Sequence, residues 1–132
     1  MHKWNIDEHG TNIDIIDEQH KYLFKLIDEI YQMIIENDNT KIKKLLIELM
    51  RHANLHFKTE IEYLIDNGSD FEEIKNHINE HYKITKELHK KIEKCFLQNE
   101  NIMIDVALFI NNWISEHIIE YDVIMFKKLK NK

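Results

Sequence analysis

Apolar residues recur three and four positions apart along most of the chain, which is the spacing of one face of an α-helix. Short polar segments divide this pattern into four stretches. They predict helices near residues 18–37, 41–66 and 70–97, and a last helix capped by Asn101. Helices of this length joined by a few residues must be antiparallel neighbours. The pattern therefore predicts an all-α protein, an up-down-up-down four-helix bundle.

Polar residues between the stretches indicate where the helices begin and end. Asn39 or Thr40 can cap the second helix, and Gly68 suits its C-terminus. Ser69 and Glu72 have the spacing of a capping box just before the third helix. These residues define loops that are too short to hold a further element.

Length and composition agree with one small helical domain. The 132 residues include no proline and only two glycines, too few for the tight turns of a β-sandwich or barrel. We therefore expect a single domain over 1–132, with an N-terminal arm at 1–17 and the bundle at 18–130. The apolar stretches fall far short of the roughly 20 residues that a membrane span needs.

Charge and cysteine usage narrow the partners and the compartment. The net charge is -6, and Arg51 is the single arginine among 18 basic residues. The chain thus lacks the basic stripe of a nucleic-acid-binding protein. Cys95 has no cysteine to pair with, and the first residues lack the apolar core of a signal peptide. We expect a cytoplasmic protein; the sequence indicates no particular protein partner.

Histidine is the unusual feature of the composition, with nine in the chain. The motif HFKTE places His56 and Glu60 one turn apart, and HINEH places His77 and His81 one turn apart. Both pairs fall on the apolar face of their predicted helix. We therefore expect these four side chains to point into the bundle.

The first and last helices each add one inward histidine, His20 and His117. Burying so many imidazoles and a carboxylate without partners would cost several kcal/mol, and a bound metal removes that cost. Histidine nitrogen with carboxylate oxygen suits iron, zinc, manganese or nickel rather than calcium or magnesium. The sequence therefore indicates a first-row transition metal.

Taken together, these motifs resemble the hemerythrin family, in particular the single-domain bacterial hemerythrins. The resemblance covers nearly the whole chain, and the family pattern of H, HxxxE, HxxxH and HxxxxD is complete. The matching segments are Trp4, IDEQHKYLF around His20, HFKTE at 56–60, HINEH at 77–81 and WISEHIIEYD from Trp113 to Asp122.

The resemblance implies two iron ions and a function. One iron would keep an open coordination position, where dioxygen binds reversibly; nitric oxide and small anions are further candidate ligands. An oxo or hydroxo group would be the third bridge between the irons. The residues carried over are His77, His81 and His117 for one iron, His20 and His56 for the other, and Glu60 and Asp122 as bridges.

Two further expectations concern the surroundings of this centre. Phe57, Trp113 and Ile118 would form the apolar wall of the ligand pocket. Asp122 follows His117 by five residues, about 140° around an ideal α-helix. We therefore expect a π-bulge, or a sideways approach, to bring Asp122 to the irons.

The remaining histidines and the departures from the family pattern are interpreted more simply. His52 lies one turn before His56 but at the edge of the inward face, so we expect a structural or solvated role. His2, His9 and His89 should be solvated. The segment after Glu60 lacks the common Tyr-Pro of the family, which leaves open the conformation of the turn between the second and third helices.

The function expected from this interpretation is non-enzymatic dioxygen binding for storage, delivery or sensing. The alternative is a di-iron oxidase or ferroxidase, or an iron-buffering protein. Ferritin-like di-iron enzymes use two Glu-x-x-His motifs and four carboxylates, whereas this chain has no Glu-x-x-His and two carboxylates among seven candidate ligands. A purely structural or partner-binding bundle, with or without a bound zinc, would leave the inward carboxylates and the repeated histidine pairing unexplained.

Overall fold

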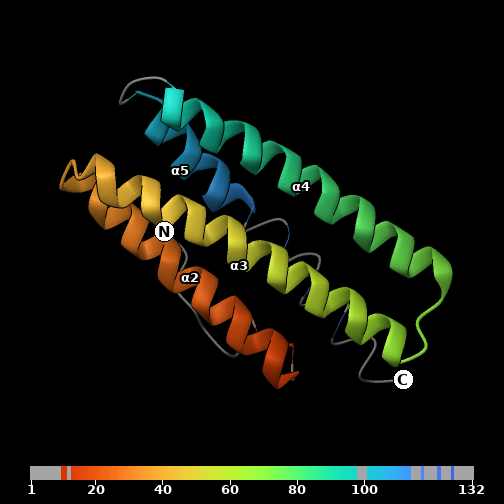
Figure 1. The fold of residues 1–132 in the computed structure, drawn as a ribbon. Helices are drawn as coiled ribbons and strands as arrows, with labels where there is room; N and C mark the ends of the chain where they lie inside the picture. The colour runs from red at the N-terminus through yellow and green to blue at the C-terminus, as the bar shows by residue number, and fades with distance from the viewer. Residues whose placement is uncertain are drawn as a thin grey trace.

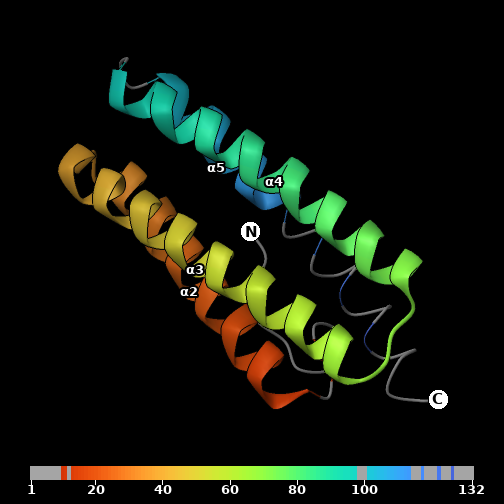
Figure 2. The ribbon, with the colours of Figure 1, turned by 45° about the vertical axis from the view of Figure 1, so that its right-hand side comes forward.

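The computed structural model describes residues 10–11, 13–97 and 101–113, together with three later positions, 117, 122 and 126. All the elements within these ranges are helices: α2 (Asp14–Ile35), α3 (Asn39–Asp66), α4 (Phe71–Leu97) and α5 (Asn101–Trp113). Each helix packs against the next, and α5 also packs against α2. Consecutive helices run in opposite directions (Figures 1 and 2). The predicted up-down-up-down bundle is confirmed.

The first helix begins earlier than the hydrophobic pattern indicates. It starts at Asp14 rather than near residue 18, and Ile13 at its N-cap makes no side-chain cap. The Asp17 carboxylate instead accepts hydrogen bonds from the backbone N–H and the hydroxyl of Thr11, at 2.8 and 2.7 Å. The sequence does not indicate this start, because isoleucine has no side-chain acceptor for a helix N-cap.

The cap of α3 is also displaced by one residue from the prediction. The side chain of Asp38 accepts a hydrogen bond from the backbone N–H of Lys41 at 3.1 Å. Asn39 and Thr40, the predicted caps, are instead the first helical residues. Three consecutive residues here have side chains that favour N-caps, so local sequence alone does not choose among them.

The turn between α3 and α4 is closed by backbone hydrogen bonds around Gly68. Its φ is 71°, a left-handed conformation that glycine adopts without strain. The N–H of Gly68 bonds to Ile65 O at 3.1 Å, and the N–H of Ser69 bonds to Leu64 O at 3.0 Å. This is a Schellman motif, so the predicted role of Gly68 at the helix end is confirmed.

The start of α4 corrects the predicted capping box. The cap is Asp70, whose carboxylate accepts from the backbone N–H of Glu73 at 2.8 Å. Ser69 does not cap the helix, because its hydroxyl makes no hydrogen bond with the described residues. Aspartate followed by glutamate three residues later satisfies the same rule one position further on.

The apolar core lies in two parts, with the buried polar residues between them. The larger cluster fills the end of the bundle where α2 meets α3 and α4 meets α5, and the smaller one closes the other end. The smaller cluster consists of Ile13, Ile16, Leu64 and Phe126.

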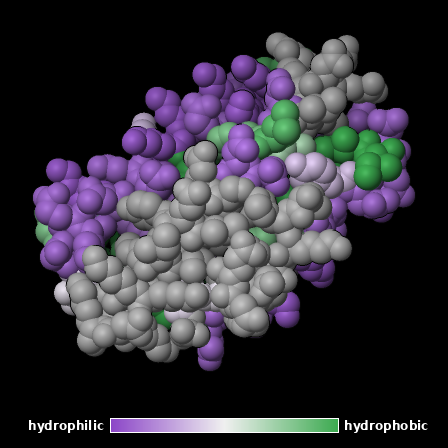
Figure 3. Space-filling model, turned by 180° about the vertical axis from the view of Figure 1, so that it is seen from behind, coloured by the Kyte–Doolittle hydropathy of each residue, from purple (hydrophilic) through white to green (hydrophobic). Residues whose placement is uncertain are grey.

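Figure 3 shows the surface from behind the view of Figure 1. On that side, the described residues are largely hydrophilic, with some apolar side chains among them (Figure 3). No described helix is both long and apolar enough to cross a membrane.

Candidate metal centre

Seven buried donor side chains meet between the two apolar clusters. They come from all four sides of the bundle, because α2, α3 and α4 and the segment after α5 each contribute at least one. Six are fully buried, and His81 is 6% exposed. The structure thus places all of the predicted ligand residues together: His20, His56, Glu60, His77, His81, His117 and Asp122.

The donor atoms form two overlapping groups. Within each group, one atom from every member lies within 4.8 Å of one atom from every other. Both groups contain the same two carboxylates, Glu60 and Asp122. The first group adds His20 and His56, and the second adds His81 and His117. Two sites that share two carboxylates are the arrangement that a pair of bridged metal ions requires.

Asp122 connects histidines from three parts of the chain. Its Oδ2 lies 3.0 Å from His20 Nε2, 3.3 Å from His56 Nε2 and 3.1 Å from His117 Nε2. The backbone at both His117 and Asp122 is π-helical, which agrees with the expected bulge. A π turn closes between residues five apart, and so both side chains face the cluster.

Glu60 on α3 is the second carboxylate, and like Asp122 it lies close to several histidines. Its Oε1 lies 2.8 Å from His56 Nε2 and 3.2 Å from His81 Nε2. His77 is slightly further away, with Nε2 3.5 Å from Glu60 Oε2 and 3.4 Å from Asp122 Oδ1. All five histidines therefore turn Nε2, rather than Nδ1, toward the carboxylates.

The alignment of these atoms fits a cation between them. Among the described residues, Glu60 Oε1, Asp122 Oδ1 and His81 Nε2 are buried without a hydrogen bond, although their neighbours are close. Glu60 Oε1 and His81 Nε2, for example, are 3.2 Å apart but not aligned for one. Such atoms point into a shared space instead of at each other. Five imidazoles and two carboxylates suit iron or another first-row transition metal, so the residues present fit a two-metal centre.

Both carboxylates are held in the ionised form. Burial and the nearby Asp122 charge raise the pKa of Glu60, but His56 and His117 outweigh them and keep that pKa well below its usual range. Burial likewise raises the pKa of Asp122, and the charge and hydrogen bond of His117 more than reverse the effect. The site is therefore negatively charged where the two groups overlap.

The histidines divide according to whether burial or the carboxylates have the larger effect on the pKa of each ring. Burial lowers the pKa of His56 and of His117, but the carboxylates outweigh it and raise these values to about 9 and about 10. Burial dominates at His81, where it lowers the pKa to about 4, and it also lowers the pKa of His20. The buried negative charge thus attracts cations, whether protons on imidazoles or a metal.

Aromatic side chains cover the centre on the side of α3, α4 and α5. The Phe57 ring stacks on His81 with centroids 4.0 Å apart and meets Trp113 edge to face at 6.0 Å. Both Phe57 and Trp113 are buried. Ile118, the third predicted pocket residue, lies outside the described residues. Beyond Phe57 and His81, a groove of about 310 Å³ opens between α3 and α4.

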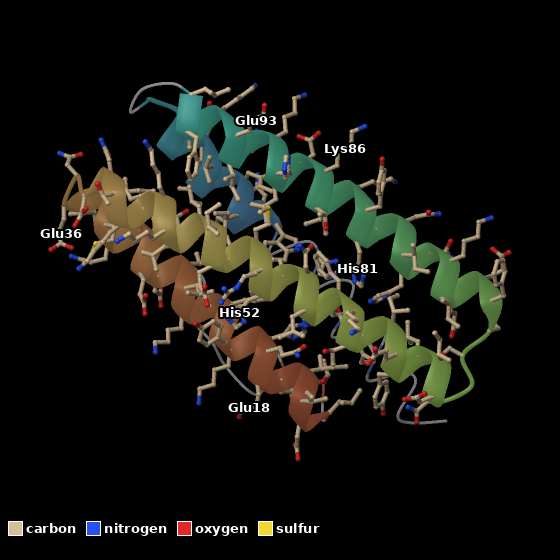
Figure 4. The ribbon with its side chains drawn as sticks, viewed as in Figure 1. Glu18, Glu36, His52, His81, Lys86 and Glu93 are labelled. Carbon is tan, nitrogen blue, oxygen red and sulfur yellow. The ribbon has the colours of Figure 1, made fainter. Side chains whose placement is uncertain are left out.

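The other histidines stay outside the cluster. His52 Nε2 bonds to Glu48 Oε1 at 2.9 Å, and its ring lies 4.2 Å from that of Tyr22. Figure 4 shows His52 on the side of α3 near α2, whereas His81 points from α4 into the bundle. His89 is exposed, and His2 and His9 lie outside the described residues.

Two residues that the sequence analysis did not single out support the centre from outside. Gln19 Oε1 lies 3.2 Å from Nδ1 of His56, and Gln19 Nε2 donates to the hydroxyl of Thr59 at 2.9 Å. Gln19 and His56 are far apart in sequence, and no motif spacing connects them. Only the packing of α2 against α3 reveals the contact.

The comparison with protein families gives an assignment for most of the chain. Residues 11–129 match the hemerythrin family model, described as the hemerythrin HHE cation binding domain. The chain belongs to the hemerythrin family. The matched region includes all seven buried donors, so the hemerythrin domain and the candidate metal centre coincide.

Individual relatives agree with the hemerythrin assignment. The bacteriohemerythrin of Clostridium acetobutylicum is 28% identical and covers 92% of this chain and 96% of its own length. That of Campylobacter jejuni is 33% identical over 77% of this chain and 68% of its own. A crystal structure of wild-type hemerythrin superposes with a TM-score of 0.82 at 24% identity, covering 98% of both chains. This last likeness supports the fold alone.

Proposed function

We propose that this hemerythrin-family chain is a di-iron protein that binds dioxygen reversibly, for oxygen storage, delivery or sensing. The observation that carries the proposal is the pair of overlapping donor groups that share Glu60 and Asp122. One metal would leave part of seven inward donors unused, whereas two bridged metals use them all. Relatives that are named bacteriohemerythrin over most of their length support the same function.

The ligand assignment follows the two groups. His20 and His56 would hold one iron, and His81 and His117 would hold the other. His77 would complete the second set, because it lies one turn before His81 on α4 with the two ring centroids 4.5 Å apart, and its Nε2 lies 3.4 and 3.5 Å from the two carboxylates. This unequal supply of nitrogen would give the iron at His77, His81 and His117 three imidazoles and the iron at His20 and His56 only two, so the iron at His20 and His56 would keep an open position. When bound, the iron pair supplies the electrons and the open position that dioxygen binding requires.

The donor set favours binding over oxidation of a substrate. Imidazoles outnumber carboxylates five to two in the buried cluster. Fewer anionic ligands stabilise high-valent iron less, which disfavours cleavage of the oxygen–oxygen bond. A di-iron oxidase or ferroxidase remains the alternative, and it is distinguished by continuous consumption of reductant in air.

The surrounding side chains exclude water from the centre. Phe57 and Trp113 are 6% and 3% exposed, and both place rings against the histidines of the second group. An apolar wall limits the entry of water and protons, which slows irreversible oxidation of the irons. The chain's own contribution is therefore to hold the irons, keep one position open and keep the pocket dry.

Metal analysis combined with visible absorption tests this proposal. Protein purified after growth with ample iron should contain two irons per chain. After anaerobic reduction, readmission of oxygen should produce a visible band that disappears again when oxygen is removed. One zinc per chain, or a band that never reverses, would contradict the proposed function.

A further inference from the structure

We infer that Gln19 and Thr59 are positioning residues that hold His56 in the tautomer with its proton on Nδ1, leaving Nε2 unprotonated for iron. This inference rests on the proposed function, because it takes His56 as an iron ligand. It adds two residues that touch neither iron nor dioxygen. Their effect is transmitted through one hydrogen-bonded chain that ends on a backbone carbonyl.

The direction of that chain follows from its last member. The carbonyl oxygen of Leu55 can only accept, so the Thr59 hydroxyl, 3.0 Å away, must donate its proton to it. The Thr59 oxygen is then left to accept from the NH₂ group of Gln19 at 2.9 Å. Gln19 must therefore turn its carbonyl oxygen toward His56.

The same logic fixes the proton on the imidazole. Gln19 Oε1 has no proton to give, so His56 Nδ1, 3.2 Å away, must carry the proton of this bond. A neutral imidazole has only one N–H. With a metal bound, Nε2 would then offer its lone pair to the cation in the space that it shares with Asp122 and Glu60. No member of the chain from Leu55 to Gln19 titrates, so the tautomer is fixed at any pH at which His56 is neutral.

The tautomer of His56 is fixed by a hydrogen bond on Nδ1, whereas that of His20, the other histidine of the same group, is not. Nδ1 of His20 is buried and makes no hydrogen bond with the described residues. The Nε2 atoms of His20 and His56 are only 2.9 Å apart, so a proton on His56 Nε2 would occupy the space that the metal needs. Gln19 therefore prevents the wrong tautomer at the position where it would be most damaging.

The Gln19 side chain is an uncharged amide, and this affects the reduction midpoint of the centre. A carboxylate partner makes an imidazole more basic and donates more electron density to the metal than an amide does. With an amide in this position, ferrous iron is stabilised relative to ferric iron. Gln19→Glu should therefore keep the acceptor for His56 but lower the reduction midpoint of the centre.

The experiment compares three variants with two matched controls, all as full chains loaded with iron. Gln19→Leu removes the acceptor, Thr59→Val removes the hydroxyl that orients it, and Gln19→Glu retains an acceptor. Gln32→Leu on α2 and Thr40→Val on α3 make the same chemical changes at exposed positions. Competition with a ferrous chelator measures iron affinity, spectroelectrochemistry measures the midpoint, and circular dichroism measures folding.

Gln19→Leu should weaken iron binding by about 10- to 100-fold, the usual cost of losing a partner of a ligating histidine. Thr59→Val should also weaken iron binding, but less strongly, because the Gln19 amide can still turn its oxygen toward His56 without the hydroxyl that orients it. Gln19→Glu should retain wild-type iron affinity with a lower midpoint, and both controls should match the wild type. If Gln19→Leu does not fold, the iron affinity of Thr59→Val tests the inference in its place.

Two results would overturn the inference. One is wild-type iron affinity in Gln19→Leu, or in Thr59→Val if Gln19→Leu does not fold. The other is equal iron loss in Gln19→Glu and Gln19→Leu, which would mean that side-chain shape matters rather than the acceptor. Failure of the proposed function would be recognised separately, because the wild type itself would then lack two irons or the reversible band.

Discussion

His117 Nε2 and Asp122 Oδ2 lie 3.1 Å apart, although the two residues are five positions apart in the chain. In a regular α-helix this spacing would turn the side chains about 140° away from each other. The backbone at both residues is π-helical, and this conformation brings them onto one face. The π-helical backbone at these two residues therefore completes the carboxylate pair, because it brings Asp122 within 4.8 Å of Glu60 in both donor groups.

Replacing Asp122 should empty most of the centre. Asp122 Oδ2 lies within 3.3 Å of Nε2 atoms from three histidines, so Asp122→Ala removes the group that both irons share. We expect iron content to fall from two per chain to less than one. Asp105→Ala, at an exposed position of α5, is the control and should keep two. Full iron loading of Asp122→Ala would exclude Asp122 as a bridge.

Periodicity and motif spacing were sufficient for the bundle and for the inward donors. His56 and Glu60, or His77 and His81, must share a helix face whatever the details of packing, because i and i+4 are neighbours on any α-helix. Helix ends were less predictable. Asp38 and Asp70 cap α3 and α4 where neighbouring polar residues offer the same chemistry, and the choice depends on backbone geometry.

A histidine inside the cluster and one outside it should respond differently to truncation. His117→Ala should lose most of its iron, since Nε2 of His117 approaches Asp122 at 3.1 Å. His52→Ala should retain two irons, because His52 bonds to Glu48 and lies outside both donor groups. Metal analysis of the two purified variants checks this. Equal losses would show that the assignment of ligands is wrong.

Removal of iron should destabilise the fold. Two ionised carboxylates and five histidines then remain buried, and only protons on the imidazoles balance the negative charge. Iron present at about 100 times its dissociation constant stabilises the native state by roughly 2.7 kcal/mol. The chelated protein should therefore unfold at a lower temperature, and iron should restore the original value. Identical thermal transitions before and after chelation would contradict this.

Outer contacts such as the one between Gln19 and His56 were beyond the reach of the sequence. A histidine motif reveals its own helix face but not which side chain on another helix meets its second nitrogen. That partner depends on the axial offset between α2 and α3, and here it places Gln19 Oε1 3.2 Å from His56 Nδ1. A shift of one turn would present a different residue.

Cys95 should be unreactive in the native protein. It is 1% exposed, and burial raises the pKa of its thiol, so both access and the thiolate fraction are reduced at neutral pH. A thiol reagent at pH 7 should label the iron-loaded protein far more slowly than protein unfolded in guanidinium. Because the pKa is raised, labelling should stay slow until a higher pH than for an exposed cysteine. Equal rates in folded and unfolded protein would contradict the buried position.

The last prediction concerns the wall of the ligand pocket. Phe57 carries no donor atom, but its ring covers His81 and contacts Trp113. Phe57→Leu should therefore keep two irons while opening a gap beside His81 and also beside His56, whose ring centroid lies 5.7 Å from that of Phe57. Water and protons would enter more readily, and the protein should lose its oxygen-dependent visible band to irreversible oxidation several times faster than the wild type.

Phe109→Leu provides the matched control for this test, because Phe109 is a half-buried residue of α5 that packs against the larger apolar cluster and lies under Lys91. The half-life of the visible band in air is measured for all three proteins, with iron content determined in parallel. Ile118→Ala extends the test to the third predicted pocket residue. An unchanged half-life in Phe57→Leu would show that this ring packs the core without protecting the irons, while an equal acceleration in Phe109→Leu would attribute the effect to general loosening of the bundle.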